Sequence, residues 1–168
     1  MSLTTEIVIK DACILFDLLD LDLMADFYRM NLSVFTTPEV IGEITDEKQL
    51  SDITIYIDSG KLVIDESGDY DAILGISSEN LGLSFADSSV LEFASKKACT
   101  ILSTDGGLRK EAAKRNLTVR GVLWIIEELH TKKIITSEKA LQKLKMYPEI
   151  NKRTPRKEIE ELIKKFTE

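Results

Sequence analysis

Short apolar runs rich in β-branched residues alternate along this chain with segments of helical periodicity. The short runs lie at 6–10, 33–36, 61–64, 100–102 and 117–119. Between them, apolar residues recur every three or four positions, as do Ile14, Leu15 and Leu18. Strands that alternate with helices predict an α/β fold, here a three-layer α/β/α sandwich around a mainly parallel sheet.

Local signals predict where several helices begin. Thr37 followed by Pro38 predicts a helix through about residue 50, and this helix carries Glu43. Ser84 opens another helix, with Asp87 in its first turn. Further helices are predicted at 69–78, 108–115, 122–130, 137–146 and 155–166. Residues 53–57 alternate isoleucine with other residues, and this pattern fits either a strand or a helix.

The composition is that of a soluble globular protein. Of the 168 residues, 43% are hydrophobic and 30% are charged. No apolar run approaches the roughly 20 residues that a bilayer-spanning helix needs. The two cysteines, Cys13 and Cys99, lie in apolar segments without metal-ligand spacing. We therefore expect both to be buried thiols in a reducing, cytoplasmic compartment.

Charge is divided unevenly along the chain. Residues 1–108 hold 6 basic and 20 acidic residues, whereas residues 109–168 hold 16 basic and 9 acidic residues. This asymmetry suits an acidic metal centre beside a basic surface that holds phosphates, but a solvated, lysine-rich helical tail explains it equally well. Four aspartates near the start are expected to lie on a solvated helix face: Asp17, Asp20, Asp22 and Asp26.

Four other carboxylates are predicted to converge. Asp11 and Asp105 each follow an apolar strand, and the carboxyl ends of parallel strands meet at one edge of a sheet. Glu43 and Asp87 project from helices that can reach the same edge. Clustered carboxylates repel one another, and a hard divalent cation removes that cost. All-oxygen ligation favours Mg²⁺ or Mn²⁺ over zinc.

The amino-acid sequences of four segments resemble the motifs of the PIN-domain nucleases, which include the VapC-like ribonucleases. In chain order these segments are IVIKDACILFDLL, TTPEVIGEI, LSFADSSVLEFA and ILSTDGGLRKEA. The resemblance covers residues 6 to about 130 and implies that Asp11, Glu43, Asp87 and Asp105 bind metal and are catalytic. It also implies that the hydroxyl of Ser103 supports Asp11. Gly106 and Gly107 stand where many members carry a further polar ligand, so one metal ion is expected.

The resemblance implies a PIN-like domain over 1–135 and a helical extension over 136–168. The first hypothesis is a Mg²⁺- or Mn²⁺-dependent endoribonuclease, either the toxin of a toxin-antitoxin pair or an RNA-processing enzyme. The second is an inactive PIN scaffold that binds RNA or a protein. The third is phosphotransfer on Asp11, which fits less well because the segment Asp11-Ala12-Cys13 lacks a second aspartate.

Three basic residues follow the predicted active-site edge and are candidates for contact with substrate phosphates: Arg109, Lys110 and Arg120. A solvated surface explains them nearly as well. The expected partners are an RNA substrate and no membrane, with an antitoxin protein and a homodimer left open.

Overall fold

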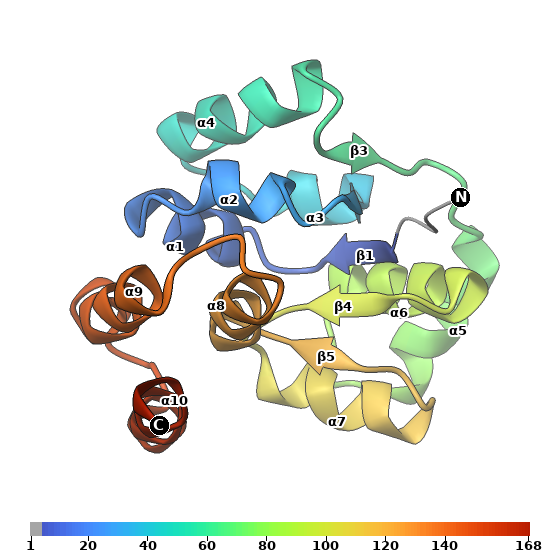
Figure 1. The fold of residues 1–168 in the computed structure, drawn as a ribbon. Helices are drawn as coiled ribbons and strands as arrows, with labels where there is room; N and C mark the ends of the chain where they lie inside the picture. Colours follow the sequence, from blue (N-terminus) through green and yellow to red (C-terminus); the bar gives the residue numbers. More distant parts are fainter. Residues whose placement is uncertain (1–4) are drawn as a thin grey trace. The chain divides into compact units, whose positions relative to one another are not determined.

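The computed structural model describes residues 5–168, which include a five-stranded, all-parallel sheet (Figure 1). The strands lie in the order β3-β2-β1-β4-β5. Their bounds are Thr5–Ile9 (β1), Leu32–Thr36 (β2), Val63–Ile64 (β3), Thr100–Leu102 (β4) and Val119–Arg120 (β5). The predicted α/β fold with a parallel sheet is confirmed.

Helices separate the strands along the chain, as parallel strands require. The helices between β1 and β5 are α1 (Cys13–Asp20), α2 (Met24–Tyr28), α3 (Pro38–Gly42), α4 (Glu47–Asp58), α5 (Tyr70–Glu79), α6 (Phe85–Lys97) and α7 (Gly106–Lys114). Three more follow the last strand: α8 (Val122–Thr131), α9 (Ser137–Ile150) and α10 (Arg156–Thr167).

The predicted helix over 37–50 is wrong, because the structure divides it in two. Thr37 is the N-cap of α3 and its side chain accepts from the Val40 N–H, as expected, but α3 ends at Gly42 and Glu43 is its C-cap. Asp46 then caps α4 by accepting from the Gln49 N–H. Glu43 therefore lies at the end of a short helix and not a turn and a half inside a long one. Residues 53–57, which fitted either element, are helical.

The structure groups into two compact units. One contains 5–14 and Asn31–Arg120, and the other contains Leu15–Met30 and Gly121–Glu168. The expected boundary between 135 and 136 stays a prediction, although in this grouping the last three helices share a unit with residues from α1 and α2.

Two buried aspartates join elements of the second unit. Asp17 is buried and accepts hydrogen bonds from the Tyr147 hydroxyl at 2.8 Å and the Asn151 side-chain amide at 3.1 Å. Asp26 is also buried and pairs with Lys139 at 2.6 Å. The predicted solvated face is therefore wrong for these two residues. Their short side chains join α1 and α2 to α9 through charge-assisted hydrogen bonds.

The core of the first unit lies between the sheet and helix α6. Val8, Val90, Leu91 and Ile101 are fully buried in it. Together with further apolar side chains from α3 and α7 they hold the start of α6 close to the end of β1. This packing fixes the position of the residues that follow β1.

The two cysteines differ in exposure. Cys99 is buried in this core, as expected, but Cys13 is exposed at the start of α1, so the prediction of two buried thiols is wrong. Burial raises the pKa of Cys99 to about 11, and the charge of Glu6 adds to the shift.

Alkylation is expected to separate the two thiols. At pH 8 only about one Cys99 side chain in 10³ is a thiolate, and the core shields it, so iodoacetamide should label Cys13 alone in the folded protein. Both should be labelled in urea. Mass spectrometry of the alkylated peptides measures this, and rapid labelling of Cys99 without denaturant would contradict the described burial.

Within residues 5–168, no helix has both the length and the apolar character needed to cross a membrane.

Candidate active site

The residues that follow the strands meet at one edge of the sheet, because every strand runs in the same direction. Lys10 and Asp11 follow β1, Thr37 follows β2, and Ser103, Thr104 and Asp105 follow β4. All belong to the first compact unit. The predicted placement of Asp11 and Asp105 at this edge is confirmed by the parallel pairing of β1 with β4.

Lys10 is the residue that sequence reasoning missed. Lys10 follows β1, and its side chain reaches Asp87 on α6, the helix against which Val8 packs. Its Nζ lies 3.3 Å from Asp87 Oδ1 and 3.5 Å from Glu43 Oε2. Burial lowers the pKa of Lys10, but the charges of Asp87 and Glu43 outweigh it, so that the net pKa is raised. The ammonium group therefore stays charged and joins two predicted ligands.

Asp87 is held in place by the start of its own helix. Its Oδ2 accepts from the Ser84 N–H at 2.8 Å, and its own N–H donates to Ser84 Oγ at 3.0 Å, which together form a capping box. The other oxygen, Oδ1, is buried and makes no hydrogen bond with the described residues. It faces the Lys10 ammonium group. One oxygen thus fixes the side chain and the other is directed at a cation.

Asp11 is fixed in a similar way at the end of β1. Its Oδ1 accepts from the Cys13 N–H at 3.0 Å, and its Oδ2 accepts from the Thr104 hydroxyl at 2.8 Å. Ser103, which was predicted to support Asp11, instead accepts from the Asp105 N–H at 3.0 Å through its buried hydroxyl oxygen. The hydroxyl that contacts Asp11 in the structure is that of the next residue along the loop.

Asp105 is the N-cap of α7. Its Oδ1 accepts from the N–H groups of Gly107 at 2.8 Å and Leu108 at 3.4 Å. This helix was predicted to begin at residue 108, and the cap moves its start to Gly106. Asp105 is exposed, so its carboxylate is open to solvent at the edge of the sheet.

The structure brings two of the four predicted carboxylates, Glu43 and Asp87, onto one shared cation and leaves Asp11 and Asp105 without a shared contact. Lys10 joins Glu43 to Asp87, and the loop at Thr104 joins Asp11 to the segment that carries Asp105. Among the residues that the structure describes, no three Asp, Glu, His or Cys side chains form a metal-binding group as they stand. The chemistry of the donors still fits a divalent cation, because all four offer carboxylate oxygens and the buried Asp87 Oδ1 already faces a cation, the Lys10 ammonium group.

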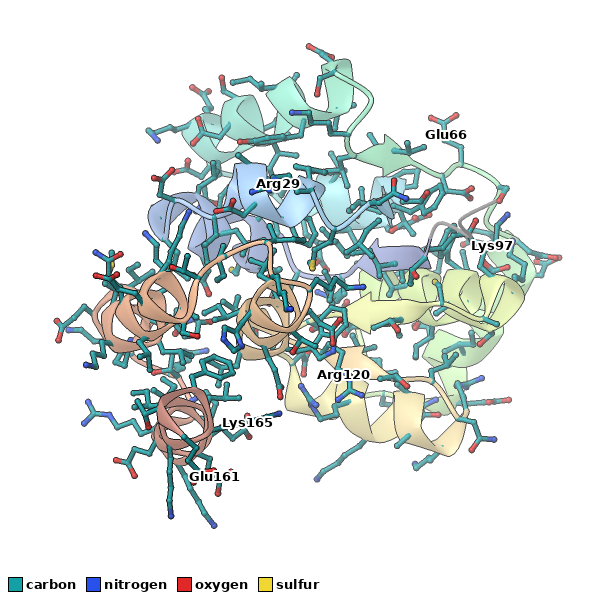
Figure 2. All side chains as sticks on the ribbon, in the orientation of Figure 1. Arg29, Glu66, Lys97, Arg120, Glu161 and Lys165 are labelled. Carbon is teal, nitrogen blue, oxygen red and sulfur yellow. The ribbon has the colours of Figure 1, made fainter. Side chains whose placement is uncertain are left out.

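The basic residues lie near this edge but have different surroundings. Arg109 donates a hydrogen bond of 3.2 Å to the Val119 carbonyl of β5, so one of its guanidinium nitrogens already has a partner. Lys110 is exposed on α7. Arg120 is exposed where β5 ends (Figure 2), and its carbonyl accepts from the Ser103 N–H.

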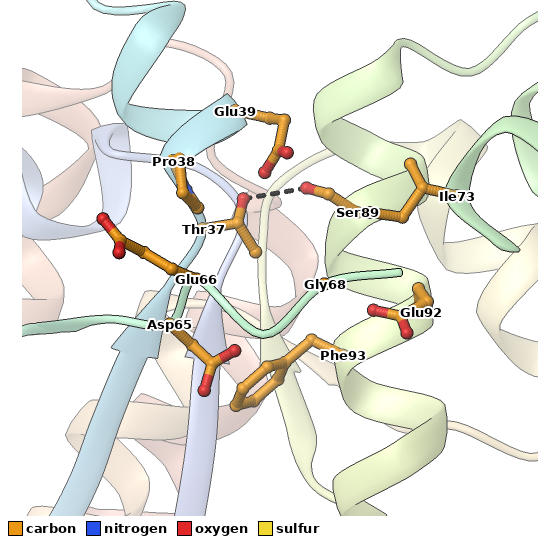
Figure 3. A pocket seen from close by; sticks show the side chains of 10 residues that line it. All are labelled: Thr37, Pro38, Glu39, Asp65, Glu66, Gly68, Ile73, Ser89, Glu92 and Phe93. Carbon is orange, nitrogen blue, oxygen red and sulfur yellow. Dashed lines mark hydrogen bonds between the residues drawn. The ribbon is translucent and has the colours of Figure 1, made fainter. Parts of the chain in front are cut away.

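A small pocket lies between the start of α3 and the middle of α6 (Figure 3). Its volume is about 40 Å³, and its walls include Glu39, Asp65 and Glu92. The Thr37 and Ser89 hydroxyls form a 2.8 Å hydrogen bond in it. Pockets that enclose a small-molecule ligand usually have several hundred Å³, so this pocket can hold water but not a nucleotide.

The fold and these side chains define an α/β protein with carboxylates at the carboxyl edge of a parallel sheet. A sequence model of the family DUF3368, described as a PIN domain, matches residues 7–168. The chain belongs to this PIN-domain family, and the predicted resemblance is confirmed. PIN domains are generally nucleases and typically use divalent metal ions, so the chain has a nuclease-type fold.

A solved structure agrees with this assignment. The chain is similar to the crystal structure of PAE2754 from Pyrobaculum aerophilum, with a TM-score of 0.53 and 17% sequence identity. The match covers 77% of this chain and 99% of that chain. At this identity the likeness concerns the fold alone. A comparison with curated proteins finds none that matches.

Proposed function

We propose that this chain is a metal-dependent endoribonuclease that hydrolyses RNA phosphodiester bonds with Mg²⁺ or Mn²⁺. The observation that carries the proposal is the buried Asp87 Oδ1, a carboxylate oxygen at the sheet edge of a PIN-family protein whose contact is a cation, the Lys10 ammonium group. Asp11, Glu43, Asp87 and Asp105 would hold the ion. Bound there, a divalent cation supplies an activated water and neutralises charge on the phosphoryl oxygens.

The chain's own residues prepare that site. The Thr104 hydroxyl and the Cys13 N–H orient Asp11, and the capping box at Ser84 orients Asp87. Two of these three donors, the N–H groups of Cys13 and Ser84, belong to the backbone, so the two carboxylates lose little further freedom when they bind a ligand. Arg120 and Lys110 would bind phosphates of the RNA on either side of the cleaved bond.

The biological role that we propose is the toxin of a toxin-antitoxin pair or an RNA-processing enzyme. In the first case an antitoxin protein would be its partner. The division of charge along the chain suits an RNA substrate. The acidic residues of the front half would hold the metal ion, and the basic residues of the back half would attract the phosphates of the RNA. A homodimer and a cytoplasmic location remain part of the proposal.

Metal dependence is the first test. Purified protein is incubated with structured and single-stranded RNA in Mg²⁺, Mn²⁺ or EDTA, and the fragments are separated on a denaturing gel. We expect internal cleavage with either metal and a rate at least about 10³-fold lower in EDTA, since the ion contributes several kcal/mol to the transition state.

The same assay distinguishes the alternatives. Binding of RNA without cleavage under every metal condition would contradict the nuclease and support an inactive PIN scaffold. Labelling of Asp11 by a phosphoryl donor would support phosphotransfer. Cleavage that persists unchanged in EDTA would indicate a contaminating or metal-independent ribonuclease and would contradict the proposal.

A further inference from the structure

Lys10 occupies the place between two of the proposed ligands. Its Nζ contacts Asp87 Oδ1 and Glu43 Oε2, and its side chain is only 13% exposed. Asp87 is more deeply buried, at 6% side-chain exposure, whereas Glu43 is 47% exposed. Lys10 therefore supplies a positive charge to the Asp87 carboxylate, which has little access to water.

Charge explains why the side chain stays there. A buried carboxylate is stable only when a cation or several hydrogen bonds compensate its lost hydration. Asp87 Oδ2 accepts a hydrogen bond from the Ser84 N–H, and Asp87 Oδ1 forms an ion pair with Lys10. Asp11 adds a further, smaller attraction to Lys10. The tethered ammonium thus compensates charge when no metal is bound.

We propose that Lys10 is a tethered cation that occupies the carboxylate site of the metal-free protein and competes with the divalent ion for Glu43 and Asp87. This inference rests on the proposed function, because it takes these carboxylates as metal ligands. Lys10 leaves Asp87 Oδ1 when a divalent ion binds, and Glu43, which is half exposed, lets it turn toward solvent. The lysine therefore weakens metal binding and protects the fold in the absence of metal.

The test compares Mn²⁺ affinity in three variants by calorimetry and by the electron paramagnetic resonance signal of unbound Mn²⁺. Lys10→Met removes the charge and keeps the apolar stem, and Lys10→Arg keeps the charge. Lys96→Met is the matched control, because Lys96 pairs at 2.9 Å with Glu92, whose side chain is also 6% exposed. We expect Lys10→Met to bind Mn²⁺ about tenfold more tightly than the wild type, and the other two variants to bind it as the wild type does.

Thermal unfolding provides a second readout. In EDTA, Lys10→Met should unfold several degrees below the wild type, and saturating Mn²⁺ should raise its melting temperature more than that of the wild type. Lys96→Met should show the same response to Mn²⁺ as the wild type.

A measurement on the wild type alone keeps the inference testable if Lys10→Met does not fold. Acetylation of Lys10 by an amine-reactive ester, followed by mass spectrometry, should be slow in EDTA and faster with Mn²⁺, while acetylation of Lys96 should not change.

The outcomes separate the two proposals. Equal or weaker Mn²⁺ affinity in Lys10→Met, with clear binding by the wild type, would overturn the role of Lys10 and leave the metal site intact. So would acetylation of Lys10 that does not respond to Mn²⁺. Absence of Mn²⁺ binding in every variant would overturn both.

Discussion

Asp87→Asn and Asp11→Asn are each expected to lower the rate of metal-dependent RNA cleavage by about 10³-fold or more. The amide keeps an oxygen that can accept from the Ser84 N–H in one variant and from the Cys13 N–H in the other. It loses the negative charge that holds a cation, so catalysis should fall much further than stability. The rate is measured on the RNA that the wild type cleaves, at saturating Mn²⁺.

Asp71→Asn is the matched control for this experiment. Asp71 lies in the first turn of α5 as Asp87 lies in the first turn of α6, but it is exposed. Its substitution should leave cleavage within about twofold of the wild type, as surface changes of this kind usually have small effects. Full activity in both Asp87→Asn and Asp11→Asn would show that the metal is held elsewhere.

Leu91→Ala is expected to reduce the free energy of unfolding by about 2–5 kcal/mol, because it removes a fully buried side chain from the core under α6. Domains of this kind have only about 5–15 kcal/mol of stability in total. The midpoint of urea unfolding, followed by circular dichroism, measures the loss. Since α6 also carries Asp87, RNA cleavage should become more sensitive to temperature in this variant.

Leu91→Met keeps most of the buried volume and is the control. It should cost less than about 1.5 kcal/mol. A loss below about 1 kcal/mol in Leu91→Ala would contradict the position of Leu91 in the core.

The strands and the helix starts could be predicted because their signals are local. The β-branched runs predicted all five strands, and Ser84 predicted the start of α6 with Asp87 in its first turn. The break after Gly42 was missed, although Asp46 followed three residues later by Gln49 is a cap signal. The apolar pattern that continued through residue 50 concealed it.

Lys10 was missed for a different reason. An ion pair with residues 33 and 77 positions away is a tertiary property, and no local pattern encodes it. Alternation along the predicted strand 6–10 would have placed Lys10 on the face of Val8. It would not have shown which carboxylates Lys10 contacts. The burial of Asp17 and Asp26 was missed likewise, because their partners Tyr147 and Lys139 come from the far end of the chain.

Three of the proposed ligands also begin helices. Asp11 accepts from the first N–H of α1, Asp87 completes the capping box of α6, and Asp105 caps α7. A descendant that abandoned catalysis would still be under selection to keep these three aspartates for folding. Glu43, whose recorded side-chain contact is Lys10, would be free to drift first. Among relatives of this chain, loss of the glutamate would therefore indicate loss of catalysis. Retention of the three aspartates would not by itself indicate that catalysis is retained.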